Sequence, residues 1–171
     1  SFGNPVNSKT IIKDFITEYA IRATEKVRQQ NSRAQGIYIF LQTNRFRKEK
    51  QYSSGIMFGL NSPSCDTSII IKLALRAIDQ IYQSGYSYHK AGIMMLDLIP
   101  SEIHQQDLFQ NTNYLLSDQR MGVIDFLNNK YGSGTITHGK IRQKDKSRWK
   151  SKSFYLSPRY TTQRDELPQV S

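Results

Sequence analysis

Apolar residues recur at three- and four-residue spacing in two stretches of the chain, and this period predicts two amphipathic helices. The first helix is expected over residues 8–30, with Asn7 or Ser8 as its N-cap. The second is expected from about Asp66 to just before Gly85, which can take the left-handed conformation of a C-terminal cap. The stripes expected to be buried are Ile12, Phe15, Ile16, Tyr19, Ala20, Ala23 and Val27 in the first helix, and Ile70, Leu73, Ala74, Ala77, Ile78 and Ile81 in the second.

β-Branched and aromatic residues predict strands over residues 36–43, 53–60 and 90–99. The polar residues 44–51 separate the first two strands as a long hairpin loop, and residues 61–64 are expected to break the second strand. The third segment is apolar on both faces for most of its length, which is typical of an interior strand. An extended piece over residues 2–6 is counted as one further strand.

The order of these elements is β-α-β-β-α-β over residues 1–100. It predicts an α+β fold, in which a four-stranded sheet carries both helices on one face and leaves the other face open for binding. Beyond Pro100 a short helix is expected over residues 117–131, with Met121, Ile124 and Leu127 on one side and Gly132 at its end. From residue 134 onward no period survives, and little independent order is expected there.

The chain carries 24 Lys and Arg against 14 Asp and Glu, a net charge of +10 that is spread over both halves. Such an excess favours a polyanionic partner, although a protein can also be basic without one. No apolar run is long enough for a membrane span, and the first residues lack the pattern of a signal peptide. The single cysteine, Cys65, excludes an internal disulfide framework, so a soluble, cytoplasmic protein is expected. Because the first residue is Ser1 rather than Met, we expect an excised fragment or a processed product.

Several segments of the chain carry a resemblance to a known family. Residues 1–3 (SFG), the order of the elements and the hairpin loop at 44–51, which holds four cations, together resemble the little-finger domain of the Y-family DNA polymerases, and residues 88–93 (YHKAGI) resemble the start of its last strand. Farther along, residues 105–109 (QQDLF), 134–136 (GTI) and 156–162 (LSPRYTT) are similar to the C-terminal region of the UmuC type, the catalytic subunit of bacterial DNA polymerase V. The resemblance covers nearly the whole chain.

The resemblance implies a little finger at residues 1–100 that binds primer–template DNA, a tether to the β sliding clamp at 101–112, and a UmuC-type appendage at 113–171. It implies that the parent protein is an error-prone translesion polymerase of the SOS response and DNA repair. The metal-binding carboxylates of the family lie in palm and finger domains, so we expect no catalysis and no cofactor in this chain, whereas the parent polymerase would use Mg²⁺. A UmuD′-like accessory dimer and RecA are further implied partners.

Four cations lie in the hairpin loop, and two basic residues enter the last strand. Cations and strand N–H groups of this kind can contact phosphates and position DNA without reading its sequence. The alternative is a solvated loop, which is the commoner role of four charges in a turn, but the resemblance favours phosphate contact. The candidate DNA-binding residues are Arg45, Arg47, Lys48, Lys50, His89 and Lys90.

Residues 105–109 resemble the pentapeptide with which bacterial polymerases bind their sliding clamp. Leu108 and Phe109 offer large apolar side chains to a pocket, and the Gln105 amide offers a directional hydrogen bond. Gln106 stands where the family often has a small apolar residue, which would weaken binding. The alternative is that Leu108 and Phe109 pack onto their own domain.

Every second residue from 140 to 152 is basic, and in an extended chain these side chains would line one edge at close to the phosphate repeat. They are Lys140, Arg142, Lys144, Lys146, Arg148, Lys150 and Lys152, and Trp149 among them could stack on a base. This run is a candidate for contact with DNA or a partner. A solvated tail explains it equally well, and the run is not part of the family pattern.

Other functions are less well supported. A freestanding ferredoxin-like nucleic-acid-binding module would need aromatic residues on the open sheet face, where Tyr38 and Phe40 could serve, but no RNP-type pattern is present. Residues 134–140 imitate a phosphate-binding loop, yet Ile141 replaces the hydroxyl that such a loop needs. The three histidines are too scattered to predict a metal site, and the absence of any convergent acid–base set disfavours a small enzyme.

Overall fold

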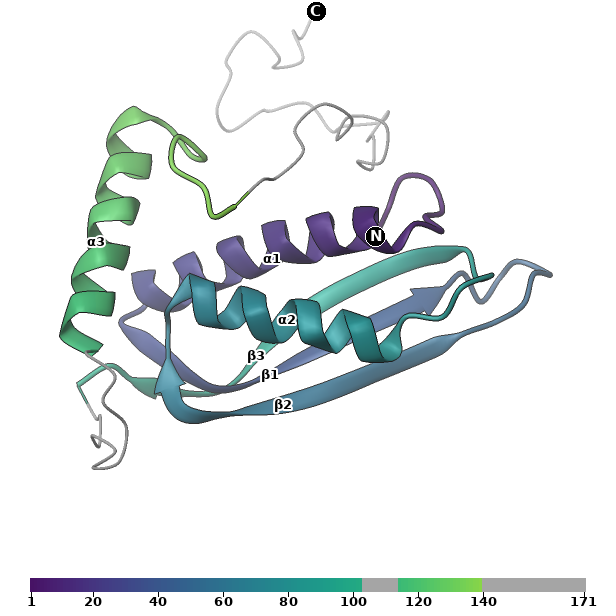
Figure 1. Cartoon of the computed structure of the whole chain (residues 1–171), viewed down its shortest axis with the longest axis horizontal. Helices are drawn as coiled ribbons and strands as arrows, with labels where there is room; N and C mark the ends of the chain where they lie inside the picture. The colour runs from purple at the N-terminus through teal and green to yellow at the C-terminus, as the bar shows by residue number, and fades with distance from the viewer. Residues whose placement is uncertain (103–113, 140–171) are drawn as a thin grey trace, which may run out of the picture.

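The computed structural model describes residues 1–102 and 114–139, and the structural statements below concern those residues. The elements follow in the order α1 (Lys9–Gln29), β1 (Ser32–Thr43), β2 (Ser53–Ser64), α2 (Thr67–Ile81), β3 (Tyr88–Pro100) and α3 (Tyr114–Tyr131). Both α1 and α2 lie over one face of the sheet, and α3 stands across their ends (Figure 1). The predicted α+β fold class is confirmed.

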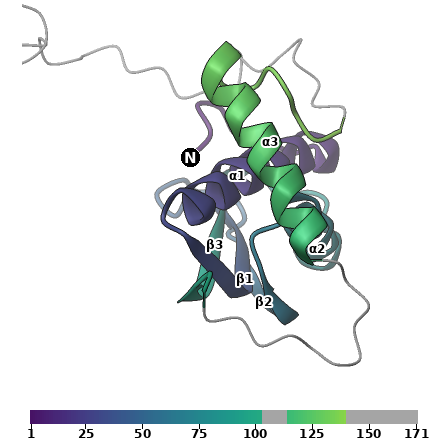
Figure 2. The same cartoon turned by 90° about the vertical axis from the view of Figure 1, so that its left-hand side faces the viewer.

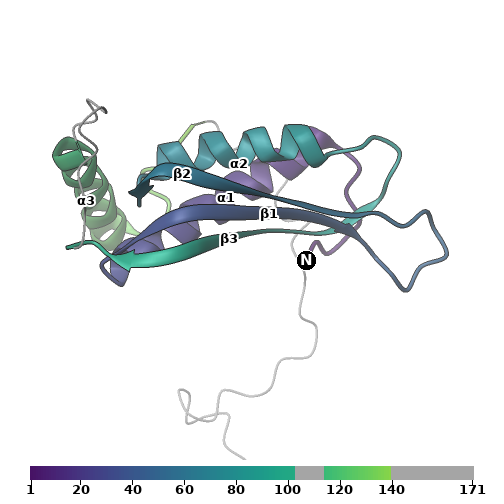
Figure 3. The ribbon, with the colours of Figure 1, turned by 90° about the horizontal axis from the view of Figure 1, so that it is seen from below.

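Antiparallel pairing joins the strands in the order β2-β1-β3. The side chains of the central strand alternate between the two faces, because successive residues of a strand point in opposite directions. Ile37, Ile39 and Leu41 are completely buried beneath the helices, whereas Tyr38 and Phe40 between them are only partly covered. Figure 3 shows the sheet from the side that neither α1 nor α2 covers.

The predicted strand at residues 2–6 is reduced to a single bridge between Val6 and Tyr88, together with a hydrogen bond from the Phe2 N–H to the His89 carbonyl at 2.8 Å. Pro5 has no N–H to donate, which prevents a continuous ladder here. The predicted fourth strand is therefore wrong, and the sheet of the described chain has three strands. β3 pairs along its length with β1 alone, so the prediction that it is an interior strand is also wrong.

The predicted break at residues 61–64 is wrong as well, because β2 continues to Ser64. Pairing with β1 shifts between Ala34 and Gly36, which lie opposite Ser64 and Gly59. Residues 60–63 are thus accommodated as an irregularity within the strand, where Pro63 donates no ladder hydrogen bond. β1 also begins four residues earlier than predicted, at Ser32 instead of residue 36.

Both predicted sheet-covering helices are confirmed, with differences at their ends. Asp66 caps α2 by accepting a hydrogen bond from the Ser68 N–H at 2.7 Å, whereas Ser8 occupies the N-cap of α1 without a side-chain hydrogen bond. α2 ends at Ile81, so Gly85 is not its cap. Gly85 instead takes its positive φ of 87° in the turn before β3.

The core lies between the two helices and the buried face of the sheet. Most of the predicted stripe positions are completely buried, as the three- and four-residue spacing requires. The fully buried helix residues that form this cluster are Ile12, Ile16, Ala20, Ile70, Ala74, Ala77 and Ile78.

α3 begins three residues earlier than predicted and ends at Tyr131, followed by Gly132 with a φ of 105°. Of the α3 side chains that the structure describes, only Met121 is buried. The helix lies against the end of the α1–α2 layer (Figure 2). Little independent order is predicted from residue 134 onward, and the described residues 134–139 are tied to α3, because Asn128 exchanges two hydrogen bonds with the Ile136 backbone at 2.8 and 3.0 Å.

Candidate nucleic-acid interface

The loop between β1 and β2 extends beyond the sheet at the end opposite α3 (Figure 3). Its four cations, Arg45, Arg47, Lys48 and Lys50, are all exposed. Arg47 makes a long ion pair with Glu49, at 3.5 Å with both side chains about half exposed. Such a pair contributes little in water, so the loop retains its positive charge for an outside partner.

One side-chain amide organises this loop. The side-chain Nε2 of Gln51 donates to the backbone carbonyl oxygens of Asn44, Arg47 and Glu49, at 3.1, 2.7 and 3.1 Å. The Thr43 hydroxyl donates to Gln51 Oε1 at 3.0 Å, so the amide is held from both sides. The Gln51 amide therefore ties the two sides of the loop together, and no local sequence pattern predicts this role.

An aromatic cluster supports the root of the hairpin. Tyr52 and Tyr86 have ring centroids 4.8 Å apart, and Tyr88 meets Tyr52 edge-on at 5.8 Å. The Tyr52 hydroxyl donates to the Ile81 carbonyl at 2.5 Å, which ties the hairpin to the end of α2. Burial raises the pKa of Tyr88, whose hydroxyl is also bonded to the Gln83 backbone. These contacts fix the direction in which the basic loop leaves the sheet.

Two aromatic rings lie over glycines on the open face of the sheet. A Cβ added at Gly55 would overlap the Tyr38 ring, and one added at Gly92 would overlap the Phe40 ring. Around these rings, Met57 and Met94 are 65% and 48% exposed. Tyr38 and Phe40 are thus displayed on this face with their centroids 6.1 Å apart.

The two candidates at the start of β3 differ. Lys90 lies opposite Gln42 at the hairpin end of the open face, and its Nζ lies 5.9 Å from the centre of the Phe40 ring. The register shifts between Gln42 and Thr43, which places His89 in an irregular step of β3. His89 Nδ1 is buried and has no hydrogen-bond partner in the described part of the chain, so this nitrogen is not displayed on the surface. The structure therefore brings Lys90, but not His89 Nδ1, to the surface of the sheet.

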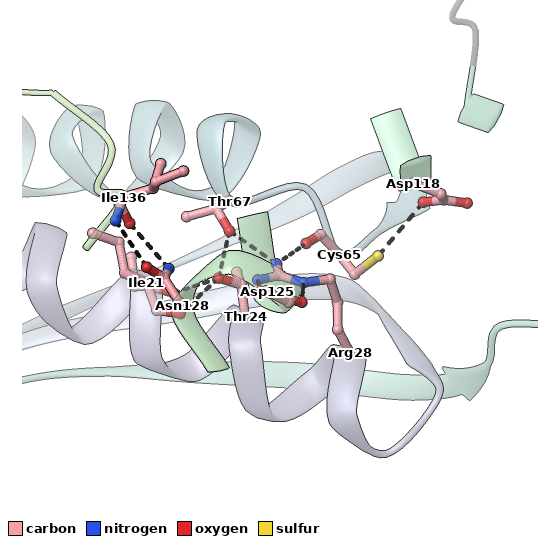
Figure 4. A network of polar contacts seen from close by, with 10 residues as sticks. Ile21, Thr24, Arg28, Cys65, Thr67, Asp118, Asp125, Asn128 and Ile136 are labelled. Atoms are coloured by element: carbon pink, nitrogen blue, oxygen red, sulfur yellow. Dashed lines mark hydrogen bonds and ion pairs between the residues drawn. The ribbon is translucent and has the colours of Figure 1, made fainter. Parts of the chain in front are cut away.

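At the opposite end of the molecule, α3 is held by charged side chains (Figure 4). Arg28 of α1 donates to both carboxylate oxygens of Asp125, at 2.6 and 2.7 Å, and its remaining nitrogen donates to the Cys65 carbonyl at 2.9 Å. Arg33 pairs with Asp118 in the same region. Both Arg28 and Arg33 therefore form ion pairs with α3.

Asp66 joins the cap of α2 to α3. It accepts hydrogen bonds from the Ser117 hydroxyl at 2.5 Å and from Arg120 at 2.7 Å. Burial alone would raise the pKa of Asp66, but the hydrogen bonds from Ser117 and the Ser68 N–H, with the charge of Arg120, outweigh burial and lower that pKa. Burial also lowers the pKa of His138, which lies beside this network.

Two groups of predicted site residues lie outside the described residues. They are the clamp-binding candidates Gln105, Leu108 and Phe109, and the basic run Lys140, Arg142, Lys144, Lys146, Arg148, Lys150 and Lys152 with Trp149. Within residues 1–102 and 114–139, no three His, Cys, Asp or Glu side chains come together as a metal site would require. No helix in the same ranges is long and apolar enough to cross a membrane.

Comparison with known proteins places these features in a family. Residues 1–108 match the model of the impB/mucB/samB family C-terminal domain, and residues 119–170 match a domain of unknown function. The chain is 34% identical over 172 residues to protein UmuC of Salmonella typhimurium, covering 99% of this chain and 40% of that protein. It is 32% identical to protein ImpB of Salmonella typhimurium and 29% identical to protein MucB of Escherichia coli, each over 170 residues, with 98% of this chain and 39% of the relative covered. The chain thus spans about two fifths of the length of these relatives.

Proposed function

This chain belongs to the impB/mucB/samB family and contains its C-terminal domain. We therefore propose that it is a DNA-binding part of a UmuC-type translesion polymerase. The observation that carries the proposal is the continuity of the open sheet face with the basic hairpin. Lys90 and the Tyr38–Phe40 pair lie on a face that neither α1 nor α2 covers, and four exposed cations extend from its end.

This surface suits DNA binding that does not depend on base sequence. Exposed Arg and Lys side chains contact phosphates, which carry no sequence information. Because Gly55 and Gly92 have no side chains, the Tyr38 and Phe40 rings lie close to the backbone of the sheet, and a wide polyanion could approach the strands closely. Binding through phosphates would tolerate damaged bases, as translesion synthesis requires.

A salt titration tests the interface. If the hairpin cations neutralise about four phosphates, the log–log slope of duplex affinity against salt should be about −3.6. Changing Arg45, Arg47, Lys48 and Lys50 together to Ala should bring this slope towards zero. The matched control changes Arg22 and Lys72 to Ala, because these cations are exposed on the helices, and it should leave most of the slope. An unchanged slope in the hairpin variant would remove the hairpin from the interface.

We also propose that residues 105–109 tether the chain to a β sliding clamp. The support is the sequence alone, in which Gln105, Leu108 and Phe109 follow β3 within nine residues of Pro100. Leu108→Ala with Phe109→Ala should abolish clamp binding, because each anchor contributes roughly 1.5–3 kcal/mol when fully buried. DNA affinity and melting temperature should stay nearly constant. A melting temperature lowered by many degrees would instead place the pair in the core of its own domain.

The chemistry of the parent protein lies outside the proposed role of this chain. We propose that the chain extends no primer and needs no cofactor, whereas the whole polymerase uses Mg²⁺. The UmuD′-like dimer and RecA are proposed partners of the whole protein, and the basic run at 140–152 is a proposed contact with DNA or a partner. Template-directed extension by a purified sample of this chain would contradict the first of these proposals.

A further inference from the structure

Phe46 stands at the tip of the basic hairpin. Its side chain is 90% exposed, more than that of any other exposed large apolar residue in the described chain. Arg45 and Arg47 flank it directly, and Lys48 and Lys50 follow. A phenylalanine in this setting contributes almost nothing to the folded core, so its large ring is available to an outside partner.

The backbone that carries Phe46 is held in place. Its N–H donates to the Asn44 side-chain oxygen at 3.0 Å, and the Arg47 N–H donates to the Asn44 carbonyl at 3.1 Å. The Gln51 amide holds the carbonyls on both sides of the tip. A contact made by this ring therefore costs less ordering of the loop than a contact from a loop without such bonds.

We propose that Phe46 stacks on an unpaired base of single-stranded DNA next to the phosphates that the hairpin cations hold. The inference rests on the proposed DNA-binding function and adds a base contact to it. Binding to an apolar groove of another protein would need a broad apolar patch on this chain. Phe46 is instead flanked in the sequence by cations, which attract a polyanion. Bases in single-stranded DNA present faces that duplex bases bury against each other, and every base can stack on an aromatic ring.

Phe46→Ala tests the contribution of the ring without changing any charge. On a single-stranded oligonucleotide the affinity should fall roughly tenfold, within the range that stacking on one base accounts for. The salt slope should stay the same, because the phosphate contacts remain. The matched control is Phe126→Ala, which removes a ring that is 61% exposed on α3 and should leave the affinity unchanged.

Phe46→Leu separates stacking from general apolar contact, since leucine keeps apolar area but has no aromatic face. It should lose nearly as much affinity as Phe46→Ala. A fluorescent reporter then locates the ring: Phe46→Trp in a Trp149→Phe background carries its only tryptophan at the tip. Its emission should be quenched by the single-stranded oligonucleotide and much less by a blunt duplex.

The outcomes separate the two proposals. If the unmodified chain binds DNA with the expected salt dependence but Phe46→Ala binds equally well, the stacking inference is overturned and the proposed function stands. Full affinity in Phe46→Leu, or equal quenching by duplex and single strand, also overturns stacking. Absence of any salt-dependent DNA binding by the unmodified chain overturns the proposed function itself.

Discussion

The helices α1 and α2 are attached to the rest of the molecule in a different way from α3. α1 and α2 are joined to the sheet through completely buried aliphatic side chains, such as Ile16 and Ile78, which belong to the same core cluster as Ile39 of β1. α3 contributes one buried apolar side chain, Met121, among its described residues, and is otherwise held by ion pairs and hydrogen bonds. The same body therefore carries helices attached by two different physical forces.

The two kinds of attachment should respond differently to salt and pH. Apolar burial depends mainly on the area removed from water and hardly at all on pH or salt at ordinary concentrations. Partly exposed ion pairs weaken with ionic strength, and carboxylates change charge with pH. We therefore expect α3 to loosen under conditions that leave the sheet and its two covering helices intact.

The largest effect is expected in the apolar layer. Ile78→Ala removes part of a completely buried side chain of α2 and should lower the free energy of unfolding by about 2–5 kcal/mol. Urea unfolding followed by circular dichroism measures this loss, which should be similar at low and high salt. The control is Met57→Ala on the open face, where the side chain is 65% exposed and the expected change is within about 0.5 kcal/mol. A strong salt dependence of the Ile78→Ala loss would contradict the apolar assignment.

An intermediate effect is expected at the attachment of α3. Arg28→Met keeps the aliphatic part of the side chain but leaves Asp125 and the Cys65 carbonyl without their donor. The expected cost is about 1–3 kcal/mol, since the arginine and aspartate side chains are only 12% and 24% exposed. Hydrogen exchange should show the α3 amides exchanging faster while β1 amides keep their protection.

Arg22→Met is the matched control for Arg28→Met. Arg22 lies on the same helix, but it is 62% exposed and pairs with Glu18 within that helix. Its loss should cost no more than about 0.5 kcal/mol and should not affect α3 exchange. Equal acceleration of α3 and β1 exchange in Arg28→Met would show that α3 is not separable from the core.

The apolar half of this comparison could be predicted from the sequence, whereas the polar half could not. The spacing of Ile12, Ile16 and Ala20 specifies one face of a helix, and the core uses that face. The partnership of Arg28 with Asp125 joins residues 97 positions apart, and no local pattern encodes such a distance. The predicted strand at residues 2–6 is wrong for a different reason: an extended segment can look like a strand, but Pro5 cannot donate to a ladder.

Some residues of the candidate interface could likewise be predicted from the sequence, and others could not. The exposed loop cations and Lys90 could be found from charge and hairpin position. The role of Gln51 could not, because its amide bonds to backbone carbonyls that any residue would supply. His89 and Lys90 are adjacent in the sequence, but the irregular step in β3 separates their side chains.

The smallest expected effect concerns the pH dependence of α3 attachment. Asp66 has a lowered pKa in the folded chain because the bonds from Ser117, Ser68 and Arg120 outweigh its burial. The charged carboxylate is therefore favoured by folding, and its contribution is complete above the ordinary carboxyl pKa of about 4. This contribution is lost as the pH falls through the lowered pKa of the folded chain, because the carboxyl group is then protonated in both the folded and the unfolded chain.

Asp66→Asn should cost about 1 kcal/mol at pH 7, where charge-assisted hydrogen bonds to Ser117 and Arg120 are replaced by neutral ones. The difference from the unmodified chain should narrow as the pH is lowered below 4, and thermal melts across pH 7 to 2.5 measure it. Asp79→Asn is the matched control, because Asp79 also has a lowered pKa, caused by hydrogen bonds from Lys13 and Lys9, but bridges α1 and α2 at the surface. Asp66→Asn should speed hydrogen exchange in α3, whereas Asp79→Asn should not. If both variants speed α3 exchange equally, the carboxylate of Asp66 has no specific part in holding that helix.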